Sequence, residues 1–481
     1  MVSPESDDNR VMGSVGISFG SPTSGQGFDV STTVSAIVAN LQAVETPWKN
    51  QLTALQSEDT ALTGIGKDLS SLSTALNALN SFSGVFSEKE GSSSDTSVVA
   101  LTSATSAAVA GSHTLVVGQL AQTFSYANKA ASIGAGDTLT GSLTIGGQTI
   151  TISDGTDTDS DGNTIPQNNT LSSLASYIND GDYGVQANVV TSATGSQLAL
   201  VSDTSGAAGA VAIDGSQLTD STSDVTGFTF GQVQQGQDAE FSVDGINTSS
   251  ASNTVTDAIP GVTMQLLSAA PTESVQVEIT NNNSDVESAV STFVSAYNTV
   301  IGDLNTQEGD DSSGNPEPLY GSSAVATLQE QLQAAIIFTQ SSGAITSLTQ
   351  LGITANDDGT LTLDGSTLDS ALDSNFEDAM NFFQTGSSST SFGANLTTTL
   401  TNLSNTGPDG AIYLALQQDS SQETNLNSNI TSQNNTISTD QTQLTTELNE
   451  ANYTLQEIPE QLQSVNELYS AITGYDENPE G

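Results

Sequence analysis

Residues 442–458, TQLTTELNEANYTLQEI, repeat apolar side chains at a helical spacing and contain no basic residue. Apolar side chains recur every seven residues, at Ile430, Ile437, Leu444, Ala451, Ile458, Val465 and Ile472. A second set fills the complementary positions, at Leu448, Leu455, Leu462 and Tyr469. About six heptads of this kind predict a coiled coil. The alternative is a solitary amphipathic helix on a globular core, but such helices are usually shorter.

Two polar residues, Asn434 and Gln441, interrupt the second set. In a coiled coil they would occupy core positions, where a polar side chain lowers stability but fixes the register and the number of helices. The seam therefore predicts a partner in a defined alignment.

A matching repeat lies near the other end of the chain. Its first set is Val34, Leu41, Trp48, Leu55, Leu62, Leu69 and Leu76. Its second set is Ile37, Val44, Ile65, Leu72 and Leu79. Trp48 is interpreted as a seam residue, with a partner-specific contact as the alternative. Two long seams at opposite ends predict a helical stalk with the rest of the chain inserted between them.

Pro47 divides the N-terminal repeat, because proline breaks a helix interior but is tolerated at the first helical position. Thr46 can cap the helix that starts there. We therefore expect two stacked helices, 31–45 and 47–80, within an N-terminal stalk segment 28–91.

Composition restricts the class of protein. At 481 residues the chain is long enough for about three domains. Charged residues make up only 12%, and five basic against 55 acidic residues leave a net charge of −50. Such a chain repels phosphate backbones and anionic lipid, so no nucleic-acid or membrane partner is expected. The absence of cysteine excludes disulfides and thiolate chemistry.

The first residues do not resemble a secretory signal, since no apolar stretch follows a basic one. We expect residues 1–27 to form a disordered acidic leader. Such a leader leaves export by another route open.

The middle of the chain, 92–282, alternates short apolar strands with Gly, Asn and Asp turns and predicts a β-rich head. The stretch SLTIGGQTITI contains a Gly-Gly pair of the kind that closes a hairpin. It opens a β-β-α-β-β unit at about 138–203. A Gly/Gln-rich stretch at 231–237 predicts a boundary between two subdomains.

Helical spacing returns after residue 283, with Val286, Val290, Phe293, Tyr297 and Ile301 on one face. We expect a helical and hairpin leg domain at 283–400, a C-terminal coiled-coil helix at 401–475 and a tail at 476–481. The expected fold is multidomain α+β. A long coiled-coil stalk is built from both termini and the middle helices, with β-rich head domains inserted.

Catalytic and cofactor-binding residues are not expected. His113 is the only histidine, so no partner exists for a triad or a zinc site, and a structural role in a strand is favoured. Asp157, Asp159 and Asp161 precede Gly162 as in the first half of a calcium loop. Asn168 stands where that loop needs a bidentate glutamate, so a solvated acidic loop is favoured over a calcium site.

Five segments in chain order resemble the family of bacterial flagellar filament cap proteins, also called hook-associated protein type 2. They are FDVSTTVSAIVANLQAVETPWKNQLTALQ, AGSHTLVVGQLAQTFS, ASNTVTDAIPGVTMQLL, SAYNTVIGDLN and LGITANDDGTLTLDGSTLDSALDSNFEDAMNFF. The β-β-α-β-β unit is also similar to a small insert of flagellins and hook-associated proteins. The chain differs from the family in its long leader, its few basic residues and Pro459 in the last helix.

The resemblance implies a structural protein, not an enzyme. It implies export through the flagellar type III channel without a cleaved signal peptide, and a homo-oligomeric ring at the extracellular tip of the filament. Flagellin would fold beneath the ring, and an export chaperone would bind the C-terminal helix. Two alternatives stay open: a flagellin or hook–filament junction protein, and a Ser/Thr-rich surface adhesin.

Overall fold

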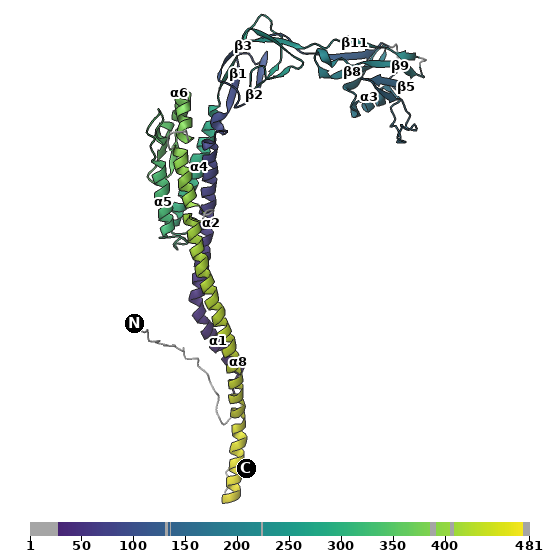
Figure 1. Ribbon diagram of the computed structural model, residues 1–481. Coiled ribbons are helices and arrows are strands. Elements are labelled where there is room, and N and C mark those ends of the chain that lie inside the picture. The colour runs from purple at the N-terminus through teal and green to yellow at the C-terminus, as the bar shows by residue number, and fades with distance from the viewer. Residues whose placement is uncertain are drawn as a thin grey trace. The chain divides into compact units, whose positions relative to one another are not determined.

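The structure is a computed structural model that describes residues 27–129, 133–134, 136–222, 225–384, 391–404 and 408–474 (Figure 1). The expected leader, apart from Gly27, and the expected tail lie outside these residues. The chain divides into two compact units. We call Met1–Asn80 with Val290–Gly481 the helical unit, and Ser81–Ala289 the sheet unit.

The helical unit begins with α1 (Val30–Gln42), a 3₁₀ turn (Ala43–Glu45) and α2 (Thr46–Asn80). Asp29 starts α1, because its side chain accepts a hydrogen bond from the Thr32 amide. The turn before Pro47 separates the two helices close to the predicted break. The last helix, α8 (Ala411–Thr473), is 63 residues long and packs against both α1 and α2 (Figure 1).

The rest of the helical unit consists of the middle helices and a hairpin. Their bounds are α4 (Asn283–Gln307), α5 (Ser323–Ile336), β17 (Ile353–Ala355), β18 (Leu361–Leu363), α6 (Gly365–Phe383) and α7 (Phe392–Leu403). The five residues predicted to share one face of α4 are all buried, which confirms that helical face. Phe392 of α7 contacts the rings of Phe293, Phe382 and Phe383, so aromatic packing joins three of these helices. The boundary expected at residue 400 falls inside α7, because a polar Thr/Asn run hides where that helix ends.

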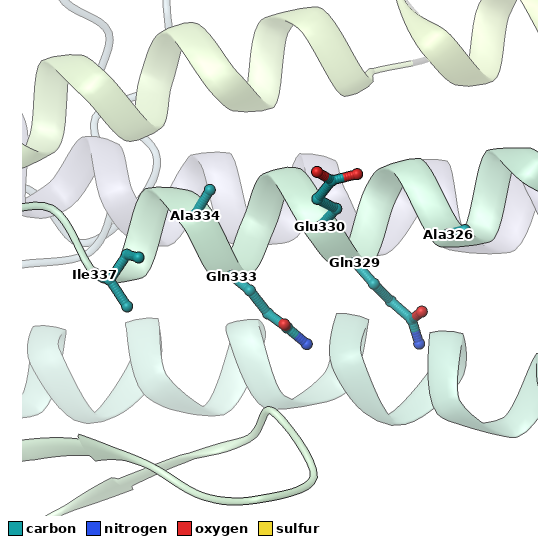
Figure 2. Close-up of a pocket in the computed structure, with 6 residues that line it drawn as sticks. All are labelled: Ala326, Gln329, Glu330, Gln333, Ala334 and Ile337. Carbon is teal, nitrogen blue, oxygen red and sulfur yellow. The ribbon is translucent and has the colours of Figure 1, made fainter.

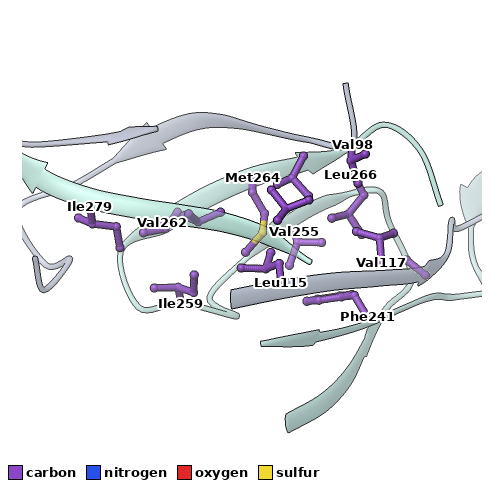
Figure 3. Packing of buried hydrophobic residues seen from close by; sticks show 14 of the residues in the cluster. Val98, Leu115, Val117, Phe241, Val255, Ile259, Val262, Met264, Leu266 and Ile279 are labelled. Carbon is purple, nitrogen blue, oxygen red and sulfur yellow. The ribbon is translucent and has the colours of Figure 1, made fainter. Parts of the chain in front are cut away.

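The sheet unit contains an eight-stranded antiparallel sheet in the order β13-β12-β3-β16-β1-β2-β15-β14. Its strands are β1 (Lys89–Ser93), β2 (Val99–Ala104), β3 (Gly111–Gln119), β12 (Ala239–Val243), β13 (Ile246–Ser250), β14 (Thr254–Thr256), β15 (Val262–Leu266) and β16 (Val275–Asn281). Figure 3 shows part of its core. Leu115 and Val117 come from β3, whereas Phe241 and Met264 come from β12 and β15, so the core joins strands that are far apart in the sequence. The expected stalk limit at residue 91 differs from the structure, where β1 already pairs with β16. The sequence of β1, KEGSS, has no apolar alternation to reveal a strand.

The chain segment between β3 and β12 forms a second hydrophobic core, which we call the inserted core. It contains two four-stranded sheets, β10-β9-β5-β6 and β11-β4-β8-β7, together with α3. The bounds are β4 (Thr123–Asn128), β5 (Leu139–Ile145), β6 (Gln148–Thr151), α3 (Leu171–Asp180), β7 (Val185–Ser192), β8 (Gly195–Ser205), β9 (Ile213–Asp220), β10 (Val225–Phe228) and β11 (Phe230–Gln234).

The hairpin β5–β6 turns at Gly146 and Gly147, both with positive φ, as a type I′ turn requires. The expected β-β-α-β-β order is present from β5 to β8. The inserted part is nevertheless larger than 138–203, because β4, β9, β10 and β11 complete its sheets. It ends with β11, close to the boundary expected at 231–237.

Candidate assembly surfaces on the terminal helices

The N-terminal seam is largely buried in the helical unit. Five of its seven residues are less than one tenth exposed: Val34, Leu55, Leu62, Leu69 and Leu76. Leu41 and Trp48 are partly buried. Val44 departs from the prediction, with 54% of its surface exposed. It lies in the 3₁₀ turn, which has three residues per turn and therefore shifts the seam out of phase.

In the 3₁₀ turn between α1 and α2, Glu45 takes the buried position that was predicted for Val44. It is fully buried, and its Oε2 lies 2.7 Å from the Nζ of Lys49 one turn later. A buried carboxylate is costly unless a charge or donor faces it. Glu45 was not among the candidate residues, since a heptad pattern counts only apolar side chains.

The C-terminal seam is covered unevenly along α8. Ile437 of the seam is buried, and so is Leu426, one turn before the first seam residue. Five further residues are partly buried: Ile430, Leu444, Leu448, Leu455 and Ile458. Ala451 and both polar positions, Asn434 and Gln441, are exposed, whereas Gln433 and Asp440 are partly covered. The covered positions change their spacing along α8, and a strict seven-residue count cannot follow that change.

The described part of the N-terminal chain begins beside Asn452, and partly covered positions on α8 continue to Pro459. There the Phe28 amide donates a hydrogen bond of 2.8 Å to the Asn452 Oδ1. Further along, Leu462 and Val465 are 44% and 60% exposed. We call Glu460–Thr473 the α8 tail. Among the residues that the structure describes, none covers the seam residues of this tail.

Carboxylates face one another between α2 and α8. Asp419 is 7% exposed, and its pKa is raised to about 6, first by burial and then by the charges of Glu58 and Asp59. A further carboxylate, Glu423, adds to this effect. We call these four residues the carboxylate cluster. None of the five basic residues of the chain lies beyond residue 129, so α8 supplies no counter-charge of its own.

A second acidic pair links α2 to α4. The pKa of Asp68 is raised to about 6 by burial and then by a hydrogen bond to Asp303 and its charge. Two carboxyl groups can share such a bond only when one holds a proton. Burial and neighbouring carboxylates therefore favour the protonated form of an aspartate at two places where α2 packs.

The acidic calcium candidate is organised by its own loop. Asp159 accepts hydrogen bonds from the amides of Asp161 and Asn163, and these bonds with the Asn163 side chain hold its pKa below the usual value. Within the described part of the chain, no group of three or more His, Asp or Glu residues could hold a metal ion. His113 lies on β3, and its Nδ1 is 2.7 Å from the Asp244 Oδ2 at the turn between β12 and β13.

A shallow open hollow of about 530 Å³ lies along α5. Figure 2 shows that Gln329 and Gln333 point to one side of this helix and Glu330 to another. Gln329 donates a hydrogen bond to Asn305 of α4, so its amide helps to join the two helices. The described helices include none that is both long and apolar enough to cross a bilayer.

Two family models match this chain in order: the N-terminus of flagellar hook-associated protein 2 at residues 26–123 and its C-terminus at residues 236–471. The B-type flagellar hook-associated protein 2 of Pseudomonas aeruginosa is 32% identical over 364 residues, which cover 69% of this chain and 74% of the relative. The chain belongs to the flagellar hook-associated protein 2 family. Among the other members, the A-type protein of Pseudomonas aeruginosa is 30% identical over 74% of this chain and 78% of its own length.

The fold agrees with this family. A crystal structure of the D1-D2-D3 domains of the flagellar cap protein FliD from Escherichia coli is similar with a TM-score of 0.52 and 25% identity. The similarity covers 75% of this chain and 99% of that one. The two hook-associated protein 2 models leave residues 124–235 unmatched, which is close to the extent of the inserted core.

Proposed function

We propose that the protein is a structural, non-catalytic cap at the extracellular tip of a bacterial flagellar filament. It forms a homo-oligomeric ring, promotes folding and polymerisation of exported flagellin and prevents flagellin from leaking away. The observation that carries this proposal is the ordered match of both terminal regions to hook-associated protein 2. The matches favour neither a flagellin or junction protein nor an adhesin.

We further propose that the terminal helices form a coiled-coil stalk. Its N-terminal side is the seam from Val34 to Leu76, and its C-terminal side is the α8 seam through Ile430, Ile437, Leu444, Leu448, Leu455 and Ile458. Burial of Leu62, Leu69 and Ile437 supports this arrangement. The sheet unit is then the head and the remaining helices the leg. Export follows the flagellar type III route, with a chaperone bound to the C-terminal helix.

Deletion and complementation test the cap proposal. In the bacterium that encodes it, loss of the gene is expected to shorten filaments and release flagellin monomer into the medium, and the intact gene restores both. Electron microscopy of the purified protein is expected to show small closed rings. Normal filaments without the gene would refute a capping role.

The role of the seam needs separate variants. Leu448→Asp with Leu455→Asp places two charges in the seam with no basic neighbour, and removal of 426–481 deletes the seam entirely. Both are expected to leave the head folded but to release flagellin. Normal filaments in the double variant would show that this seam does not carry the function.

A further inference from the structure

Two short chain segments connect the inserted core to the eight-stranded sheet. Residues 120–122 lead from β3 to β4, and residues 235–238 lead from β11 back to β12. The amides of Gln122 and Gln237 each donate a hydrogen bond to the carbonyl of the other residue, at 2.8 and 3.1 Å. A ribbon of two strands is only marginally stable on its own. The orientation of the inserted core therefore depends on what else holds it.

The end of β8 supplies a third connection. The Gly206 amide donates a hydrogen bond of 3.0 Å to the Gln122 carbonyl. The next amide, of Ala207, donates a hydrogen bond of 2.7 Å to the Asp238 Oδ1. Two successive amides of the inserted core thus bond one residue of each connecting segment.

Residues 251–253, which we call the strap, connect β13 to β14 at opposite edges of the eight-stranded sheet. A connection of this length reaches about 14 Å when extended. The outer strands of a flat sheet with eight strands would lie about 34 Å apart. The sheet is therefore curled, and the strap between its edges has little freedom to move.

The strap is bonded to both cores. The Asn253 Oδ1 accepts a hydrogen bond of 2.7 Å from the Ala121 amide, and its Nδ2 donates one of 2.9 Å to the Ala121 carbonyl. The Ser205 hydroxyl, at the end of β8, donates a hydrogen bond of 2.5 Å to the Ala251 carbonyl. The strap thus offers the inserted core an acceptor that the eight-stranded sheet holds in place.

Glycine at position 206 allows this close approach. Gly206 has a φ of +87°, and a Cβ there would lie 2.5 Å from the Asp238 Oδ1 and 2.8 Å from the Ala251 Cα. A residue with a side chain would be strained in this conformation and would collide with both neighbours. The fit is therefore specific to glycine.

We propose that residues 205–207 are a latch that holds the inserted core in one orientation on the eight-stranded sheet. Asp238 and Ala251 receive the latch, and both lie within residues 236–471, which match the C-terminal family model. The latch itself lies in the unmatched insert and bonds them mainly through its backbone. Whatever surface the inserted core carries is then presented at a fixed angle. This arrangement does not depend on the proposed function.

Distances between two spin labels test the latch in the full chain. Val190→Cys places one label on the inserted core, and Ile246→Cys places the other on the eight-stranded sheet. These residues are 54% and 73% exposed, and the chain has no cysteine of its own. With the labelled protein diluted into unlabelled protein, one narrow distance distribution is expected. A broad distribution in this otherwise unchanged chain would overturn the proposal.

A latch variant, Ser205→Ala/Asp238→Ala, removes two side-chain bonds between the cores. It is expected to widen the distance distribution at least twofold. The matched control is Ser192→Ala/Asp214→Ala, which removes one hydroxyl donor and one carboxylate acceptor whose bonds stay within the inserted core. The control should leave the width unchanged. Equal widths in the latch variant and the control would overturn the proposal.

Hydrogen exchange shows whether the latch variant stays folded. Exchange of the Gly206 and Ala207 amides should become about tenfold faster, because their bonds to the other core open more often. Protection of β3 and β5, one strand from each core, should stay the same. Gly206→Val is a second variant that keeps every bonding side chain and pushes the latch away by size alone. It should widen the distribution as well, and an unchanged width would argue against the latch.

Discussion

A buried aspartate is treated differently in the two units. In the sheet unit, Asp220 is fully buried and its Oδ1 accepts a 2.8 Å hydrogen bond from the Thr222 amide. In the helical unit, Asp419 is nearly as buried but interacts with Glu58 and Asp59. The reason is the backbone: turns have amides to spare, whereas amides inside a helix are already bonded within it.

The difference shows how an acidic chain can hold a fold. In the sheet unit a backbone amide two residues later bonds the buried Asp220, and the two cores of this unit close within one stretch of sequence. The helical unit must bring together segments from both ends of the chain, and carboxylates face one another where α2 packs against α8 and against α4. Changes at those interfaces should therefore affect one unit and spare the other.

The largest effect is expected for Ile437→Asp, which places a charge at a position that is only 4% exposed. The free energy of unfolding of the helical unit should fall by about 3–5 kcal/mol, because the charge would be buried and α8 carries no basic residue to pair with it. Protection of sheet-unit amides in hydrogen exchange should be unchanged. Leu414→Asp is the control in the same helix, at a residue 51% exposed, and should cost less than about 1 kcal/mol. Equal losses in both variants would contradict the comparison.

The reverse experiment is Leu200→Ala in β8. Leu200 is fully buried in the inserted core, so the sheet unit should lose about 3 kcal/mol of stability while the helical unit keeps its own. The neighbouring Val201 points to the other face of the strand and is 37% exposed. Val201→Ala is the control and should lower the stability of the sheet unit by less than about 1 kcal/mol. Exchange rates resolved by peptide distinguish the units. Loss of protection throughout both would argue against their independence.

A smaller effect is expected from pH. The pKa of Asp419 is about 6 in the folded chain against an ordinary 3.8, so between these values the folded state binds more protons than the unfolded state. Stability of the helical unit should therefore fall as the pH rises through this window and level off above it. Asp419→Asn should stabilise the unit at pH 7 by on the order of 1 kcal/mol and flatten the pH profile. Glu460→Gln, in the exposed tail, is the control. Identical melting temperatures of the wild type at pH 4.5 and pH 7 would exclude this linkage.

The smallest effect is expected from salt. The Debye length is about 8 Å at physiological ionic strength, so added salt screens the carboxylates between helices and the repulsion between chains that each carry −50. The free energy of unfolding of the helical unit should rise by about 0.3 kcal/mol, which is similar to the contribution of an exposed charge pair. The rise for the sheet unit should be smaller. Sedimentation velocity should show larger assemblies as salt rises from low values. Assemblies that dissociate over this range would contradict repulsion as the dominant effect.

Periodic patterns allowed the main helices to be predicted from sequence. The repeat from Leu55 to Leu76 and the face of α4 depend only on local spacing, and both are buried in the structure. The two glycines of the β5–β6 hairpin were equally informative, since few other residues adopt their backbone conformation.

Features that depend on pairing between distant segments were not predictable in the same way. The partners of Asp419 are set by the alignment of α2 with α8, and composition does not contain that alignment. The extent of the inserted core depends on β4, β9 and β11. Apolar and polar residues alternate only weakly in these strands, and the strands that they pair with are distant in the sequence. At Glu45, a change of helix type moved the buried position by one residue.

Pro459 makes α8 easier to bend at one point along its length. Proline has no amide hydrogen, so the carbonyl of Leu455 loses its bond one turn earlier and the helix has a weakened joint there. A rod with one weak joint bends at that joint first. A sideways force on the last turns of α8 is thus expected to be absorbed at residues 455–459, and the packing around Ile437 is shielded from that load.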